Sequence, residues 1–596
     1  MTKFGNGLTQ FYRVMLLIFA VFEIAILFAM SVFFICYISS DTNEFTFFCK
    51  DNAALNIVII IAFVAILFLL KKRSVISGLI SKLEDDSFFT KARKTMLWTI
   101  AIIGLAWVVI TQYVPGSDQL DVMSSAYKYG IGATDMVEAG GYLDKWPHNI
   151  GITTIERLLA YIVGDFNVMF MQLLNIPGIV LIYKKIVDTW GKLGGSRFSQ
   201  ICTLACGIIF YPLIMYASFV YGNIWHVTLA LIAFDAELDY FEKKRNKYIL
   251  KCAIALGLSF VIKASAIIFL VALSIFAIIL GLKEKSKWYK VVSLIAALGV
   301  SVIIFSAVPK TILSKTTGVD IREDGIWAFI AMGLQEDGTA PGWYNGYCLS
   351  VYYDNNRDSE LAEQIAKEET FNRLNYLFSD KHHFYEFFSK KIASMWIEPT
   401  YSSYWINQVR THRVSFPGWL DAFMSAKGYT VAARIFDIFE ILIYLGTLLW
   451  LILEDKANFT SKSFLLLCFV GGFTFNLIWE TKSQYTITYF VMLFPYALTG
   501  FELLLDRGLE IIKKSNKLLL IYACASIVLF LTGYVFDASH CLSQHNNEYA
   551  VYVEQWSTSD STESVNEINI MKAWLKGYEE QSIYYQKLLN DNGIAY

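Results

Sequence analysis

The chain has 596 residues, of which 56% are hydrophobic, 16% aromatic and only 17% charged. No soluble domain can hide that much apolar side chain in one core, so the composition requires lipid as a solvent. The formal net charge is -2, and the basic residues are dispersed between apolar runs, which argues against a nucleic-acid partner. The cysteines show neither metal-ligand spacing nor a paired framework and therefore say little about function.

The first expected element is a membrane span that follows a short polar start, Met1 to Thr9. No small-residue cleavage site follows it, so we expect a retained helix and not a removed signal peptide. Apolar runs of about 20 residues, enough to cross a hydrocarbon layer of about 30 Å, recur along nearly the whole chain. We predict an all-α polytopic membrane protein with about thirteen spans. They are 14–37, 55–70, 95–114, 167–185, 201–219, 225–241, 248–262, 264–282, 289–308, 431–453, 463–479, 485–504 and 517–535.

Lysine and arginine mark alternate connections between these spans. The basic connections are 71–94, 184–197, 243–247, 283–287 and 507–517. Because short basic loops stay in the cytoplasm, this pattern predicts a multi-pass protein of the cell membrane with a cytoplasmic N-terminus and an extracytoplasmic C-terminus.

This prediction of spans and orientation divides the chain into a transmembrane domain, residues 1–535, and an extracytoplasmic tail, residues 536–596. A first outer loop at 115–166 and a large outer segment at 309–430 are expected to form a small outer domain. The largest cytoplasmic loop, near 71–94, is too short for a nucleotide-binding βαβ unit with a Gly-rich turn. Any chemistry therefore needs an energy-rich substrate on the outer face, and a sugar carried on a polyprenyl phosphate in the bilayer meets that need.

Two carboxylates open the first outer loop, directly after a predicted span. They are Asp118 and Asp121 in Pro115-Gly116-Ser117-Asp118-Gln119-Leu120-Asp121. Transfer of a sugar from phosphate to a hydroxyl needs a carboxylate that accepts the proton, an effect worth about 10²–10⁴ in rate. Either residue fits this role and Asp118 is the preferred candidate. An equally weighted alternative is that both acids cap a helix starting near Val122.

The same loop continues with a segment that is dense in turn formers, Gly140 to Gly151, and contains Trp146-Pro147-His148-Asn149. His148 and Asn149 are its polar tips, and both can contact phosphate or sugar hydroxyls. The alternative is a turn between two interfacial helices, with Trp146 in the aromatic belt at the membrane surface.

Charged residues also interrupt two later apolar stretches. Glu480 and Lys482 lie in the short connection between the spans 463–479 and 485–504, and Lys263 follows Phe260-Val261-Ile262. An ammonium at either lysine could offset the charge of a leaving phosphate, and Glu480 could orient that cation or hold a sugar hydroxyl. The alternative is that these lysines simply reach water from the ends of their helices.

Two further acids, Glu23 and Glu440, fall inside predicted spans. Isolated acids within a membrane are candidates for function. We expect both to form hydrogen bonds between helices.

The order of these motifs resembles the GT-C class of integral membrane glycosyltransferases, which includes protein O-mannosyltransferases and lipid A aminoarabinose transferases. Gram-positive bacterial members are similar in several elements, and the resemblance covers roughly residues 90 to 500. The matching elements are Asp118-Gln119, Trp146-Pro147-His148-Asn149-Ile150-Gly151, Lys263, Met332-Gly333-Leu334 and Trp479-Glu480-Thr481-Lys482-Ser483-Gln484-Tyr485.

The resemblance implies an inverting hexosyltransferase that uses a polyprenyl-phosphate donor and a catalytic Asp at the position of Asp118. It adds Tyr485 to the expected donor-binding residues. Gln119 stands where relatives tend to have an acid, and Gln484 stands where many have Arg, so Lys482 is the expected substitute contact to phosphate. The Trp-Trp-Asp-x-Gly element of oligosaccharyltransferases is absent from the sequence, which argues against transfer of whole glycans to Asn. Their metal-binding Asp-x-Asp element is absent too, so we expect no obligatory metal and no cofactor.

The sequence thus predicts a membrane glycosyltransferase with Asp118 as general base. It is expected to bind donor through His148, Asn149, Lys263, Glu480, Lys482 and Tyr485. The acceptor is a cell-envelope glycan, a glycolipid or a protein. Two alternatives stay open. One is a transporter or flippase of lipid-linked saccharides, and the other is a polysaccharide polymerase or ligase.

Overall fold

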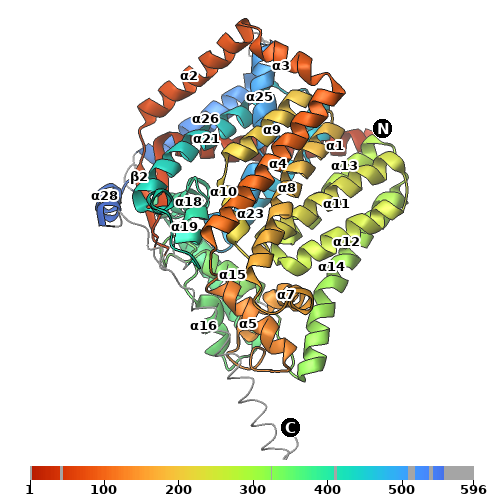
Figure 1. Ribbon diagram of the computed structural model, residues 1–596, viewed down its shortest axis with the longest axis vertical. Helices are drawn as coiled ribbons and strands as arrows, with labels where there is room; N and C mark the ends of the chain where they lie inside the picture. Colours follow the sequence, from red (N-terminus) through yellow and green to blue (C-terminus); the bar gives the residue numbers. More distant parts are fainter. Residues whose placement is uncertain are drawn as a thin grey trace, which may run out of the picture.

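The computed structural model describes residues 3–40, 44–323, 325–408, 412–507, 517–535 and 541–555. Nearly all regular structure in these ranges is α-helical (Figure 1). Eight helices are long and apolar enough to cross a membrane, or up to ten spans if two bent helix pairs each count as one. The prediction of a helical multi-pass membrane protein is confirmed at this level.

The eight long apolar helices form the body of the protein. They are α1 (Lys3–Phe33), α2 (Ala53–Lys72), α4 (Asp86–Thr111), α8 (Val168–Lys192), α13 (Ile267–Lys283) with the preceding turn η3 (Ala264–Ala266), α14 (Trp288–Thr317), α21 (Ala426–Leu453), and α24 (Ile487–Val491) continued by α25 (Phe494–Arg507). The first bent pair joins α9 (Arg197–Ile209) to α10 (Pro212–Met215) and η2 (Tyr216–Ser218) at 58°, and the second joins α22 (Lys456–Lys462) to α23 (Phe464–Ile478) at 67°.

Three of the thirteen expected spans are helical but are not among these ten. They are α11 (Asn223–Lys243), α12 (Lys247–Ile262) and α26 (Lys517–Val535). Helix α11 carries acids near its end, of which Asp235 pairs with Lys185 at 2.5 Å. Helix α12 has only 16 residues, fewer than the roughly 20 that cross a bilayer.

The first expected span ends earlier than predicted. Helix α1 stops at Phe33, and a two-stranded antiparallel hairpin follows, β1 (Phe34–Ile38) paired with β2 (Thr46–Lys50). The strands are rich in aromatic and β-branched residues, which favour extended structure. Helix α28 (Asn546–Gln555) packs on this hairpin, where the rings of Tyr37 and Tyr549 stack with centroids 3.9 Å apart. The other residues of the expected tail, 536–540 and 556–596, lie outside the described residues.

The basic connections gather at one end of the body. Arg197, at the start of α9, donates hydrogen bonds to the carbonyl oxygens of Leu83 and Glu84, at the end of α3 (Val75–Leu83). Arg93 on α4 pairs with Asp188 on α8. These contacts bring the connections 71–94 and 184–197 together at the same end of the helical body.

The other end is built from short helices. They are α5 (Asp118–Gly130), α6 (Tyr142–Lys145), η1 (Pro147–Asn149), α7 (Ile150–Val163), α15 (Ile326–Gly333), α16 (Tyr347–Tyr353), α17 (Ser359–Ser379), α18 (Lys381–Trp396), α19 (Ser403–Gln408), α20 (Gly418–Met424) and η4 (Ser483–Tyr485). In Figure 1, α5, α7, α15 and α16 lie together at the bottom, opposite α2 and α3 at the top. Residues from the expected loops 115–166 and 309–430 therefore meet at one end.

Candidate functional site

A cavity of about 540 Å³ lies where the short helices meet the body. Its wall combines η1, the start of α11, the end of α12, α15, the end of α23 and η4. Five of the eight residues expected from the sequence to form the site line this cavity, namely His148, Asn149, Lys263, Glu480 and Tyr485. They are separated by up to 337 positions in the chain (485 minus 148), and the fold brings them to one hollow.

Lys263 supplies the cation of the cavity. It lies in extended conformation between α12 and η3, which ends the helix and turns its side chain toward Asn223, whose Oδ1 accepts a hydrogen bond of 2.6 Å from Nζ. Nζ also lies 5.1 Å and 5.6 Å from the ring centroids of Tyr485 and Tyr221. Burial lowers the pKa of Lys263 to about 8, and the negative charge of Glu480 opposes that shift.

Glu480 is the acid of the same wall. Its Oε2 accepts a hydrogen bond of 3.2 Å from the Tyr485 hydroxyl. Burial raises the pKa of the Glu480 carboxyl, and Lys482 and the Tyr485 hydrogen bond counteract part of that rise. The cavity therefore carries opposite charges on Lys263 and Glu480, an arrangement that can hold both an anionic and a hydroxyl-bearing ligand.

Asp118 is connected to the cavity by a chain of hydrogen bonds. Asn149 donates from Nδ2 to the hydroxyls of Tyr142 and Tyr221, each at 2.9 Å. The Tyr142 hydroxyl in turn lies 3.4 Å from Oδ1 of Asp118. Asp118 is exposed and is not among the residues that line the cavity. It is therefore a solvent-accessible carboxylate that is linked to the wall residue Asn149 through one intervening side chain, Tyr142.

The alternative role of Asp118 and Asp121 as helix caps does not match the observed geometry. Helix α5 begins at Asp118, and the N-cap position is Ser117, which has a positive φ of 54°. Both acids lie in the first turn of the helix, where the helix dipole favours negative charge. Burial and the neighbouring Asp118 raise the pKa of Asp121, which does not line the cavity.

The turn around His148 fits closely against α12. The centroid of the His148 ring lies 6.0 Å from the ring centroids of Trp146 and Phe329. Trp146 therefore packs against other side chains at this end of the protein. A Cβ on Gly151 would lie 2.0 Å from the carbonyl oxygen of Val261, two residues before Lys263. Gly151 thus lets α7 approach the last turn of α12 and holds His148 and Lys263 beside one cavity.

Lys482 takes a different position from the one expected. It does not line the cavity, and its ammonium pairs with Glu44 at 3.4 Å. Nζ also lies 5.0 Å from the ring centroid of Trp343 and 6.0 Å from that of Trp405. Lys482 therefore contacts Glu44 and two tryptophan rings, and Lys263 is the lysine that lines the cavity.

The segment 479–482 is anchored to the segment 333–342. Lys391 on α18 is buried and donates to the carbonyl oxygens of Gly333 and Trp479, the latter at 2.7 Å. A Cβ on Gly333 would lie 2.6 Å from the carbonyl oxygen of Ile478, and the Thr481 amide donates to the Gly342 carbonyl at 2.8 Å. These contacts hold the Met332-Gly333-Leu334 element directly against the motif around Glu480.

Sequence reasoning missed several wall residues. Tyr221 lies just before α11, and Asn223 and His226 lie in its first turn; all three line the cavity. Gln484 also lines the cavity. It is 9% exposed, and among the described residues its Oε1 has no hydrogen-bond partner. A buried acceptor without a donor is costly, so Gln484 is a candidate contact for a ligand.

The acids inside spans behave as expected from the sequence. Glu440 on α21 accepts hydrogen bonds from Tyr401, from Tyr444 at 3.3 Å and from Ser31 on α1 at 3.5 Å. Glu23 on α1 accepts from Thr474 on α23 at 3.5 Å. The prediction of interhelical hydrogen bonds is confirmed, and neither acid lines the cavity.

No family model matches the chain, and no curated protein matches it either. The resemblance to GT-C glycosyltransferases therefore depends on the motifs alone.

Proposed function

We propose that the protein transfers a sugar from a polyprenyl-phosphate donor to an acceptor hydroxyl, with Asp118 as general base. The observation that carries the proposal is the common cavity of His148, Asn149, Lys263, Glu480 and Tyr485, to which Asp118 is connected through Tyr142. The proposal includes the orientation inferred from the basic loops, with this cavity at the outer face.

The polar and the apolar residues of the cavity wall suit the phosphosugar and the isoprenoid chain of such a donor. Asn223, Tyr221 and Tyr485 of the wall lie next to Lys263, and much of the remaining wall is apolar. The apolar lining residues are Phe260, Ile262, Ile267, Ile268, Ile326, Phe329 and Phe475. An isoprenoid chain gains from burial against such a surface, and the phosphate gains a charge-assisted hydrogen bond from the Lys263 ammonium.

The reaction is a single displacement at the anomeric carbon. The acceptor oxygen forms a bond to that carbon while the bond from the carbon to the phosphate oxygen breaks. Asp118 takes the acceptor proton, and polyprenyl phosphate leaves with its negative charge next to Lys263. A positioned base contributes about 10²–10⁴ in rate, and a fixed cation stabilises charge that develops on the leaving group.

Gln484 and Glu480 are assigned to the sugar. The unpaired Oε1 of Gln484 needs a donor, and a sugar hydroxyl supplies one. Glu480 accepts from Tyr485 through one oxygen, which leaves acceptor capacity for a second hydroxyl. On this assignment Gln484, which stands where many GT-C relatives have Arg, contacts the sugar. Lys263 contacts the phosphate.

The function class is tested with purified protein in liposomes that contain a radiolabelled polyprenyl-phosphate sugar. The expected result is covalent transfer of label to an added envelope extract and release of unlabelled polyprenyl phosphate. Label that crosses the bilayer while still attached to its lipid would contradict the proposal and favour a flippase. Products with long saccharide chains would favour a polymerase or ligase over transfer of a single sugar.

A further inference from the structure

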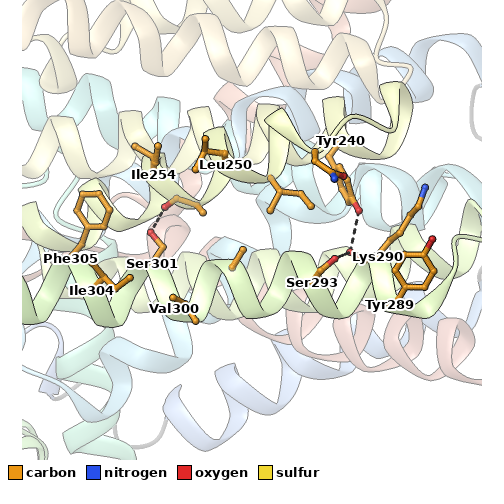
Figure 2. Close-up of a pocket in the computed structure, with 14 residues that line it drawn as sticks. Tyr240, Leu250, Ile254, Tyr289, Lys290, Ser293, Val300, Ser301, Ile304 and Phe305 are labelled. Carbon is orange, nitrogen blue, oxygen red and sulfur yellow. Dashed lines mark hydrogen bonds between the residues drawn. The ribbon is translucent and has the colours of Figure 1, made fainter.

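A second hollow, of about 650 Å³, runs along the outside of α12 and α14 and shares no lining residue with the cavity of the candidate site. Figure 2 shows it between the two helices. Leu250, Ile254, Val300 and Ile304 line it, and each is more than 40% exposed. The hollow is therefore a groove on the surface of the helical body.

The groove is polar at one end and apolar at the other. Tyr240, Tyr289, Lys290 and Ser293 lie at the polar end in Figure 2, and Ile254, Val300, Ile304 and Phe305 lie toward the apolar end. The hydroxyls of Tyr240 and Ser293 donate to the Lys290 carbonyl at 3.2 Å and 3.1 Å. These bonds hold the backbone at the polar end while the Lys290 side chain lines the groove.

Positive charge concentrates at the polar end. The segments 242–251 and 283–290 there contain nine lysines and arginines, five in the first and four in the second, against only Glu242 and Glu284. Within the part of the chain that the structure describes, no carboxylate pairs with Lys290, and only Lys243 of this set forms an ion pair, with Asp239. The groove thus combines an apolar slot with unneutralised cations at its mouth.

We propose that this groove binds one anionic glycerophospholipid, with its phosphate at Lys290 and one acyl chain along Ile254, Val300 and Ile304. The axial distance along α14 from Tyr289 to Phe305 is about 24 Å, from 16 residues at about 1.5 Å each. This distance exceeds half of a hydrocarbon core of about 30 Å, so the groove accommodates the chain of a lipid in a single leaflet. Basic pockets between spanning helices are suited to anionic lipid headgroups.

The charge pattern selects this occupant over a neutral lipid or a protein helix. An acyl chain needs only the apolar slot, which any phospholipid can use. The lysine at the mouth adds an attraction that depends on net negative charge in the headgroup, worth about fivefold in binding per lysine. A protein helix would need a wider contact surface than one slot between two helices.

The test is native mass spectrometry of the full chain in detergent, titrated with dioleoyl phosphatidylglycerol or dioleoyl phosphatidylcholine. We expect the first phosphatidylglycerol to bind several-fold more tightly than phosphatidylcholine. The variant Lys290→Gln should lose about fivefold in affinity for phosphatidylglycerol and little for phosphatidylcholine. The matched control is Lys72→Gln, an exposed lysine of the basic end on α2, which should bind like wild type.

A second variant tests the acyl-chain path independently of charge. Ala297 lines the middle of the groove, and Ala297→Leu fills the slot, so it should weaken binding of both lipids. A photoactivatable phosphatidylglycerol bound to the unmodified protein should label residues in 240–305. Equal binding of the two lipids, wild-type binding by both variants, or labelling only elsewhere would overturn the proposal. Displacement by equimolar polyprenyl phosphate would assign the groove to that lipid instead.

Discussion

Lys391 and Trp479 are joined by a hydrogen bond of 2.7 Å from the lysine ammonium to the tryptophan carbonyl oxygen, one residue before Glu480. The same ammonium holds the carbonyl of Gly333. Lys391 is buried, and burial lowers its pKa to about 7. A single side chain from α18 thus fixes the backbone that presents Glu480 and Gln484 to the cavity, without lining the cavity itself.

We predict that Lys391→Met destabilises this end of the protein. The substitution leaves the buried Gly333 carbonyl and the part-buried Trp479 carbonyl without this donor, at a cost of about 1–3 kcal/mol for a fully buried group. The apparent melting temperature in detergent should fall by several degrees. Lys390→Met is the control, because the ion pair of Lys390 among the described residues is an i,i+4 pair with Glu386, worth about 0.3–0.5 kcal/mol. Equal melting temperatures for the two variants would contradict the anchoring role of Lys391.

The pH dependence of donor binding should report on Lys263. Its pKa is lowered to about 8, so the ammonium is charged below pH 8 and loses its proton as the pH rises through that value. Binding of a polyprenyl-phosphate sugar should therefore weaken from pH 7 to pH 9.5. The measurement is the dissociation constant in nanodiscs, taken across this range at constant ionic strength.

Lys263→Arg separates this titration from other effects of pH. Arginine keeps its charge throughout the range, so the variant should show a flat profile even if its affinity is lower at neutral pH. An unchanged downward slope in the arginine variant would assign the pH dependence to another group.

Gln484 should affect the donor more than the fold. Gln484→Leu removes a buried acceptor that has no partner among the described residues, so the melting temperature should stay constant or rise. Loss of one hydrogen bond to the sugar should raise KM by about tenfold. Gln408→Leu is the matched control: Gln408 is buried and donates to the Met424 carbonyl. That variant should melt lower at an unchanged KM, and a reversal of this pattern would refute the sugar contact.

The orientation of the chain can be read from cysteine labelling. Among the described cysteines Cys524 is the exposed one, so Cys524→Ser provides the background. In it, Asp118→Cys should react with a membrane-impermeant maleimide added to intact cells, and Lys72→Cys should react only after lysis. The opposite pattern would place the cavity in the cytoplasm, where a donor presented from outside cannot reach it.

Much of the fold follows from hydropathy. Apolar runs predict helices at the right places because a chain in lipid must satisfy its backbone hydrogen bonds within each segment. The number of spans is harder to predict. Helix α11 is helical over its expected range, but Asp235 and Asp239 near its end form ion pairs with lysines. The hairpin after Phe33 was missed because its apolar residues look like a continuation of the first span.

The wall of the site was predictable only in part. Lys263 and Glu480 stood out because charged residues interrupt apolar runs at those points, and His148 stood out as a polar tip of a segment dense in turn formers. Tyr142 and Tyr221 gave no such signal, since aromatic residues are common at membrane surfaces, and only the fold brings both hydroxyls to Asn149. The partner of Lys482 was equally hidden, because Glu44 lies 438 residues away in sequence.

The most direct test of the central claim is the single-turnover rate of Asp118→Asn at saturating polyprenyl-phosphate sugar. The account predicts a rate lower by about 10²–10⁴ with donor affinity close to wild type, because Asp118 lies outside the cavity wall that holds the lipid. Glu138→Gln, an exposed acid in the same loop, serves as the control with wild-type rate. Transfer by Asp118→Asn at the rate of the control would contradict the account.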